Sequence, residues 1–472
     1  MYSDMAEEGA GKKLHIVMFP WLAFGHILPF LELSKFIARE GHKISFISTP
    51  RNIHRLPKTP PHLASSFTFV KIPLPKIQGL PENAESTMDV GPEDQGLLKK
   101  AYDGMEDDVA RFLRNSCADA VIYDFSAFWV SSIAMDLGIP RFFFCIFPSW
   151  FMDFCGTTED LIDELKDRKR PEDLMSPPKW VTFGTKVAYK YYEAKLIVGV
   201  GEKDASGFSD AYRGGIGISQ SDAVLIRHCH EFETEWFNLL GNLYQKEVIP
   251  LGYLPPHFQE TENPSSDNWV SIKEWLDTKT KGSVLYIALG SEATPNQDQL
   301  TELAHGLELS QLPFLWAFRK PAISTVKLPD GFEKRTEGRG MVWKGWVPQL
   351  NILRHDSVGG FLTHSGWASV VEALMLGVPL ILLPIMADQW LNARVLDENE
   401  MGLEVARNDE DGSISRDSVA WAVRRVMVEE EGHKFRYKAK EAMEHAFGDR
   451  GIHDRYVRDF INHLLQKSKY NE

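Results

Sequence analysis

The second half of the sequence contains a predicted strand, a tight turn and a helix start in immediate succession. Residues 358–363 form a short apolar run that suits a buried strand, residues 364–366 a turn, and residues 367–374 the beginning of a helix. The first turn of a helix offers unpaired backbone N–H groups and the positive end of the helix dipole. A pyrophosphate would be stabilised there, and His364 and Ser369 could donate further hydrogen bonds.

Four more side chains near this turn have complementary uses. Trp346 offers a flat face on which a base could stack, and Glu372 could accept hydrogen bonds from ribose hydroxyls. Asp388 and Gln389 could hydrogen-bond a sugar. Taken singly, the tryptophan and histidine of this segment are more often core residues of a buried strand-turn-helix unit. The whole set favours a site for a sugar nucleotide.

A histidine and an aspartate stand at the ends of two predicted strands in the first half of the chain. His26 follows the apolar run 14–20 in a glycine-containing turn, and Asp124 ends the run 120–123. Neutral imidazole could take the proton that a hydroxyl loses as it attacks an anomeric carbon, while Asp124 could hold the other ring nitrogen. The alternatives are a capping aspartate and an ordinary loop histidine, and the spacing alone leaves them open.

Apolar runs that suit strands alternate with helical patterns along both halves of the sequence. The expected strands are residues 14–20, 43–48, 67–72, 120–123, 141–146, 283–289, 313–318, 341–347, 358–363 and 379–384. This alternation is typical of parallel sheets with helices on both faces. We therefore expect an α/β fold with two Rossmann-like, doubly wound domains.

Domain boundaries are indicated by a change in composition. Prolines and polar residues interrupt the apolar rhythm at residues 251–268, which predicts a linker between an N-terminal domain, 1–250, and a C-terminal domain, 269–451. The last segment, 452–472, contains an apolar helical stripe that something must bury. The stripe consists of Tyr456, Val457, Phe460, Ile461, Leu464 and Leu465.

Aromatic residues accumulate between residues 147 and 195, where the periodicity fails. They could form one wall of a hydrophobic pocket for a second substrate, or they could merely cover the edge of the sheet. The candidates for contact with that substrate are Phe24, Met88, Phe125, Phe147, Trp150 and Phe151.

The composition disfavours several classes of partner. The 472 residues carry a net charge of −14, which argues against nucleic acids and anionic membrane surfaces. The 4 cysteines lack metal-ligand spacing and the N-terminus carries no secretory signal, so a reducing, cytoplasmic location is expected. No apolar run suits a membrane span.

Asp409 and Asp411 match a metal-binding D-x-D pattern, but their polar loop is better explained by turn chemistry.

The segment 346–389 closely resembles the signature box of plant family 1 UDP-glycosyltransferases. It matches W-x-P-Q-x-x-I-L-x-H, then G-x-F-x-T-H-x-G-W, then S-x-x-E, then G-V-P and a final D-Q, in order and spacing. The resemblance covers nearly the whole chain. It implies two domains facing across a cleft, the GT-B type of fold, with the last helix crossing back onto the first domain. It also implies a monomeric enzyme that uses a UDP-sugar, with neither a metal nor another cofactor.

The resemblance assigns roles residue by residue. The catalytic base would be His26 and its partner Asp124. The expected donor-binding residues are Trp346 and Val347 for uracil, Gln349 and Glu372 for ribose, Ser291, His364, Gly366, Trp367 and Ser369 for the pyrophosphate, and Asp388 and Gln389 for the sugar. Ser365 and Ala368 depart from the box, which usually has cysteine and asparagine there, and Ile146 stands where a threonine or serine often touches the donor sugar.

Segments of the first domain resemble the branch that extends sugars on flavonoid, triterpenoid or diterpenoid glycosides. They are FPWLAFGHILPFLELSKFIA, ISFISTPRNIHRLPK and PLPKIQGLPENAESTMDV. The expected reaction is an inverting transfer of glucose from UDP-glucose to a hydroxyl of such a glycoside. The alternatives are a rhamnosyltransferase that uses UDP-rhamnose, a UDP-sugar epimerase, and a protein that binds a UDP-sugar without turnover.

Overall fold

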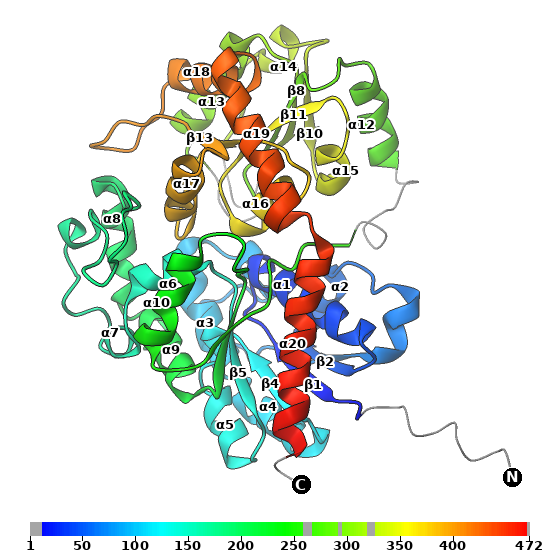
Figure 1. Cartoon of the computed structure of the whole chain (residues 1–472), viewed down its shortest axis with the longest axis vertical. Coiled ribbons are helices and arrows are strands. Elements are labelled where there is room, and N and C mark those ends of the chain that lie inside the picture. Colours follow the sequence, from blue (N-terminus) through cyan, green and yellow to red (C-terminus); the bar gives the residue numbers. More distant parts are fainter. Residues whose placement is uncertain (1–11, 258–266, 291–294, 319–325, 470–472) are drawn as a thin grey trace, which may run out of the picture.

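The computed structural model describes residues 12–257, 267–290, 295–318 and 326–469. These residues form two parallel β-sheets, one in each half of the chain, and helices surround both sheets (Figure 1). The α/β architecture with two doubly wound domains is confirmed. The first domain lies below the second in Figure 1.

The first sheet has seven strands in the order β3-β2-β1-β4-β5-β6-β7. Its strands are β1 (His15–Phe19), β2 (Lys43–Ser48), β3 (Phe67–Lys71), β4 (Ala120–Tyr123), β5 (Arg141–Cys145), β6 (Ala223–Ile226) and β7 (Val248–Pro250). Side chains of β1 alternate between two cores, with Ile16 and Met18 on one face and Val17 and Phe19 on the other. This burial on both faces explains why the strand is a continuous apolar run.

Ten helices of the described chain belong to this first half. They are α1 (Phe24–Arg39), α2 (Pro50–Arg55), α3 (Gln95–Asp103), α4 (Glu106–Ser116), α5 (Val130–Asp136), α6 (Ser149–Cys155), α7 (Thr158–Ile162), α8 (Tyr191–Ile197), α9 (Asp210–Gln220) and α10 (Thr234–Tyr244). The short helices α6, α7 and α8 occupy the aromatic segment in which no clear periodicity is visible in the sequence.

The second sheet has six strands in the order β10-β9-β8-β11-β12-β13. They are β8 (Val284–Ala288), β9 (Phe314–Phe318), β10 (Gly340–Lys344), β11 (Val358–Thr363), β12 (Leu380–Leu382) and β13 (Gly402–Glu404). The helices are α12 (Asp267–Asp277), α13 (Gln297–Ser310), α14 (Phe332–Arg335), α15 (Gln349–Leu353), α16 (Trp367–Leu374), α17 (Gln389–Glu398), α18 (Arg416–Met427), α19 (His433–Ala442) and α20 (Arg450–Lys469).

The observed strands differ from the expected ones in two respects. Strand β10 ends at Lys344, whereas the sequence predicts a strand over 341–347, so Trp346 lies in a loop. Strands β6, β7 and β13 are absent from the sequence prediction. Strands β7 and β13 have three residues each, which is too short for a period to be recognised, whereas β6 is a four-residue apolar run like that of β4 and gives the same signal.

Helix α20 packs back onto the first domain (Figure 1). Its Val457, Phe460, Ile461 and Leu464 belong to the same core as Ile16 and Met18 of β1. The ring of Phe460 lies 5.4 Å from that of Phe142 in β5. The apolar stripe of α20 is therefore buried by the first domain, although the helix follows the second domain in sequence.

Two stretches of chain connect the domains, one after β7 and one before α20. The buried side chain of His453 hydrogen-bonds to both stretches. His453 of α20 accepts a hydrogen bond at Nδ1 from the Tyr253 N–H (3.2 Å) and donates from Nε2 to the Phe447 carbonyl (3.1 Å). Tyr253 follows β7, and Phe447 precedes α20. The rings of Tyr253 and Phe447 also stack with their centres 4.5 Å apart.

Among the described residues, no helix combines the length and the apolar character that crossing a membrane requires.

Candidate active site

His26 and Asp124 meet at the carboxyl edge of the first sheet. Strands β1 and β4 are hydrogen-bonded neighbours, so the residues that follow them lie side by side. His26 is in the first turn of α1, and its Nδ1 lies 2.8 Å from Oδ2 of Asp124. The hydrogen bond that the sequence predicts is present. A carboxylate can only accept, so Nδ1 carries the proton and Nε2 carries the lone pair of the neutral ring.

Asp124 also caps the short 3₁₀ turn at Phe125–Ala127. Its Oδ1 accepts from the Phe125 N–H (2.8 Å), and its Oδ2 accepts from the Trp21 N–H (3.0 Å). The side chain of Asp124 therefore caps this turn and pairs with His26 at the same time. With 2% of its surface exposed, this carboxylate is fixed in place by three donors.

Aromatic side chains flank the imidazole of His26. The rings of Phe125 and Phe147 both have their centres 5.6 Å from it, and Phe151 lies 4.8 Å from Phe147. All three phenylalanines are half-buried. They form an apolar surface beside the proposed base.

The remaining candidates for contact with an acceptor have different surroundings. Phe24 begins α1 and is half-buried. Met88 is 40% exposed in the 3₁₀ helix Thr87–Asp89, whose Thr87 N–H donates to the carbonyl of Leu22, just before α1 (3.0 Å). Trp150, in contrast, is fully buried and donates its indole N–H to Asn392 of the second domain (2.9 Å). Trp150 therefore lies in the contact between the domains, and its contact with an acceptor stays a prediction.

The predicted anion site has the expected strand-turn-helix form. Ser365 lies in the left-handed region at φ 65°, and Gly366 is the N-cap of α16. A Cβ on either Gly290 or Gly366 would collide with the ring of His364, so both positions require glycine. Burial lowers the pKa of His364 to about 4, so at neutral pH this ring offers an N–H donor and no positive charge.

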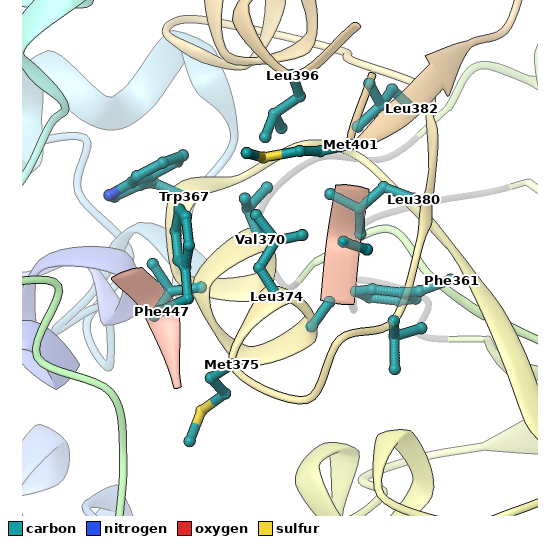
Figure 2. Close-up of a cluster of buried hydrophobic side chains, with 14 of the residues drawn as sticks. Phe361, Trp367, Val370, Leu374, Met375, Leu380, Leu382, Leu396, Met401 and Phe447 are labelled. Carbon is teal, nitrogen blue, oxygen red and sulfur yellow. The ribbon is translucent and has the colours of Figure 1, made fainter. Parts of the chain in front are cut away.

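Trp367, the first residue of α16, has its side chain in the core. It is 4% exposed and packs edge to face on Phe447 at 6.1 Å and on Trp150 at 5.0 Å. Figure 2 shows its ring beside Phe447, with Val370 and Leu374 on the same helix. A pyrophosphate contact by this residue would therefore come from its backbone N–H.

The residues expected at the ribose form a hydrogen-bonded cluster. Gln349 donates from Nε2 to Glu372 (2.8 Å) and Ser369 (3.3 Å), and its Oε1 accepts from the Tyr286 hydroxyl (3.1 Å). Burial raises the pKa of Glu372 to about 7, and the bond from Gln349 partly offsets that rise.

The residues expected to bind the uracil base of the donor lie in the loop after β10. Trp346 is 57% exposed there and Val347 is buried at 7%. An exposed indole face at this place suits stacking on a base.

Asp388 and Gln389 stand at the start of α17. Gln389 is anchored because its Oε1 accepts from the Ile385 and Met386 N–H groups (3.0 and 3.1 Å), which leaves its amide N–H groups as the donors for a sugar. Burial raises the pKa of Asp388 to about 6. The hydrogen bond from Asn392 and the electrostatic influence of His26 and Arg227 lower this pKa and partly offset the rise. His26 and Asp388, on different domains, are thus within electrostatic range of each other.

Two other predictions concern residues away from this cluster. Ser291 lies outside the described residues. Asp409 and Asp411 lie in the turn that the sequence indicates, with Asp411 accepting from the Ser413 N–H (2.8 Å) and Asp409 3.4 Å from Lys190. Within the described ranges, no group of three or more His, Cys, Asp or Glu side chains is arranged to hold a metal ion.

Residues that sequence reasoning missed complete the site. Asn392 bonds to Asp388, and Arg227 is buried just after β6, where its guanidinium donates to the Tyr253 carbonyl (2.8 Å). Asn392 had one signal, its position one helical turn after Asp388. Arg227 had only its place after the short apolar run that forms β6.

Comparisons with known proteins agree with this geometry. The family model "UDP-glucoronosyl and UDP-glucosyl transferase" matches residues 260–439. UDP-glycosyltransferase 91D1 of Stevia rebaudiana is 48% identical, over 97% of this chain and 94% of its own length. Soyasaponin III rhamnosyltransferase of Glycine max is 42% identical, over 97% of this chain and 96% of its own length.

A solved structure shows the same fold. The Glycyrrhiza uralensis enzyme UGT73P12, complexed with glycyrrhetinic acid 3-O-monoglucuronide, has a TM-score of 0.79 and 21% identity, with 98% of each chain covered. The chain belongs to the plant UDP-glycosyltransferase family and has its GT-B fold. It is an enzyme that transfers a sugar from a UDP-sugar to an acceptor.

Proposed function

We propose that this enzyme transfers glucose, with inversion, from UDP-glucose to a hydroxyl of a plant glycoside, and that the hydroxyl belongs to a sugar of a terpenoid or flavonoid glycoside. The observation that carries the mechanism is the 2.8 Å pair of His26 and Asp124, whose imidazole acts electrostatically on Asp388 at the start of α17. The acceptor class is supported by the name of the soyasaponin relative, because soyasaponins are glycosides.

In the proposed step, the acceptor oxygen attacks the anomeric carbon while Nε2 of His26 takes its proton. The bond between that carbon and the diphosphate oxygen breaks, and UDP departs toward the N-terminus of α16. One displacement inverts the anomeric centre. Asp124 favours the imidazolium that forms, and a base of this kind contributes about 10²–10⁴ in rate. The helix dipole and nearby donors take up the charge of UDP, so the proposed step uses no metal.

The donor would lie along the second domain. In this proposal Trp346 stacks on uracil and the Val347 backbone pairs with it, while Glu372, held by Gln349, accepts from the ribose hydroxyls. The pyrophosphate would meet His364, Ser369, Ser291 and the backbone of Gly366 and Trp367, and the sugar would meet Asp388 and Gln389.

UDP-rhamnose is the second candidate donor, and the relative named as a rhamnosyltransferase favours it. An assay with UDP-glucose and UDP-rhamnose in parallel, each with a panel of glycosides, separates the possibilities by mass spectrometry of the products. We expect UDP release only when an acceptor is present, and a mass gain of one hexose. Conversion of the sugar nucleotide without acceptor would indicate an epimerase instead, and saturable binding without turnover would indicate a binding protein.

We further propose that the enzyme acts as a monomer, since one chain supplies both the base and the donor site. Its four cysteines are all free thiols, which suits the reducing cytoplasm.

A further inference from the structure

Helix α17 carries contacts with the first domain along its length. Its Arg394 pairs with Glu193 (2.6 Å), and Glu398 accepts from the hydroxyl of Thr185 (2.9 Å). Just past its end, Asn399 donates to Glu233 (2.7 Å). The same helix begins with the two residues proposed for the donor sugar. The first domain therefore holds the element from which the sugar-binding side chains extend.

Asn392 uses its amide group fully within this arrangement. Its Oδ1 accepts from the indole N–H of Trp150 (2.9 Å), and its Nδ2 donates to Asp388 Oδ2 (2.6 Å) and to the Ser365 carbonyl (3.0 Å). An indole only donates, while a carbonyl and a carboxylate only accept. These partners therefore fix which end of the amide faces which group.

Trp150 and Asn392 are each completely buried. Trp150 belongs to α6 of the first domain, and its ring also packs on Trp367 at 5.0 Å. Because no water is available to replace a lost bond at such a place, the indole N–H sets the orientation of the amide, and the amide sets the orientation of the Asp388 carboxylate.

We propose that Asn392, oriented by Trp150 of the first domain, is a positioning residue that aims the Asp388 carboxylate at the hydroxyls of the donor sugar. The proposal deepens the proposed function and rests on its assignment of Asp388 to the sugar. It links the contact between the domains to recognition of the sugar, the part of the donor that UDP itself lacks.

The test compares binding of UDP-glucose with binding of UDP, by calorimetry, in Asn392→Ala and Trp150→Phe. Loss of the Asn392 amide should weaken the binding of UDP-glucose by about tenfold more than the binding of UDP, because only UDP-glucose carries the sugar that contacts Asp388 in this proposal. Trp150→Phe keeps a large ring and removes the N–H, and it should give a smaller change in the same ratio. The KM for UDP-glucose should rise while the KM for the acceptor stays near wild type.

Trp129→Phe is the matched control. Trp129 is buried in the core of the first domain, packs on Phe19 and Tyr102, and donates its indole N–H to Asp103 (3.2 Å). Its ratio of UDP-glucose to UDP affinity should match the wild type. Equal weakening of both ligands, or no change in either, would overturn the proposal. If Asn392→Ala does not fold, Trp150→Phe decides by the same ratio.

The binding ratio does not depend on turnover. Absence of any transfer by the wild type would count against the proposed function alone, and UDP-rhamnose as a parallel probe covers the second donor.

Discussion

Glu372, which is half-buried, and Asp388, which is buried, are carboxylates whose pKa values are raised, to about 7 and about 6. Burial is the first cause in each case, since a charged carboxylate loses solvation away from water. Both side chains are proposed to accept hydrogen bonds from hydroxyls of the donor, a role for which the ionised form is suited. Binding of UDP-glucose should therefore depend on pH in the neutral range.

The first prediction concerns this pH dependence. In the free protein Glu372 is protonated below about pH 7, so UDP-glucose affinity should fall as the pH drops through that value, and fall further through about pH 6 as Asp388 is protonated. Each proton that must be released weakens binding by up to about tenfold per pH unit. Calorimetric titration between about pH 5.5 and 8.5 measures the effect.

Glu372→Gln is the control for the same titration. Glutamine has nearly the same shape but does not titrate, so the change near pH 7 should disappear while the change near pH 6 remains. A wild-type affinity that is flat from about pH 6 to 8 would contradict the assignment of Glu372 to the donor site.

At this scale the sequence predicts the reactive side chains better than their surroundings. His26 and Asp124 could be paired through the family resemblance, since each follows a predicted strand but the spacing alone leaves the pairing open; the structure shows that the two strands are neighbours. The contact between Trp150 and the second domain could not be predicted, because an aromatic residue in an irregular segment gives no sign of whether it faces a ligand or another domain. Its partner Asn392 lies 242 residues away, and no local pattern joins such positions.

At the scale of elements, apolar runs determine where the strands form, and single buried polar side chains hold neighbouring segments together. The clearest case is His453, which pairs with the backbone of both stretches that join the domains. Burial lowers its pKa, which keeps the ring neutral and able to accept at Nδ1. The imidazole of His453 thus connects α20 to the segment after β7 through a hydrogen bond.

His453→Ala should lower the thermal midpoint by several degrees. The change leaves the Tyr253 N–H and the Phe447 carbonyl unpaired and opens a cavity, at a cost of about 2–4 kcal/mol. For domains of this size, about 1 kcal/mol corresponds to about 2–4 °C. His62→Ala, at an exposed position, should change stability by less than about 0.5 kcal/mol. Equal midpoints for the two variants in a melting experiment would contradict this role for His453.

Two of the three strands that the sequence did not predict share a physical cause. Strands β7 and β13 are stabilised by neighbours in the sheet, and their three residues each are too few to show a pattern. The stripe on α20 was visible as a 3.6-residue period, because a twenty-residue helix gives the pattern room to repeat.

At the scale of the molecule, two sheets with their own cores are joined by α17, α20 and the aromatic cluster around Trp367 (Figures 1 and 2). Trp367 and Trp150 come from different domains and pack on each other. The arrangement places His26 of the first domain within electrostatic range of Asp388 of the second. In the proposed mechanism, a base on one domain thus serves a donor held by the other.

Turnover and UDP binding by His26→Ala test this account most directly, with Asp124→Asn measured beside it. Loss of the imidazole should lower kcat by about 10²–10⁴ while UDP affinity stays within a few-fold of wild type, because the nucleotide is held by the second domain. Asp124→Asn should lower kcat as well, since an amide can no longer hold Nδ1–H in the required form. Wild-type turnover by His26→Ala would contradict the account.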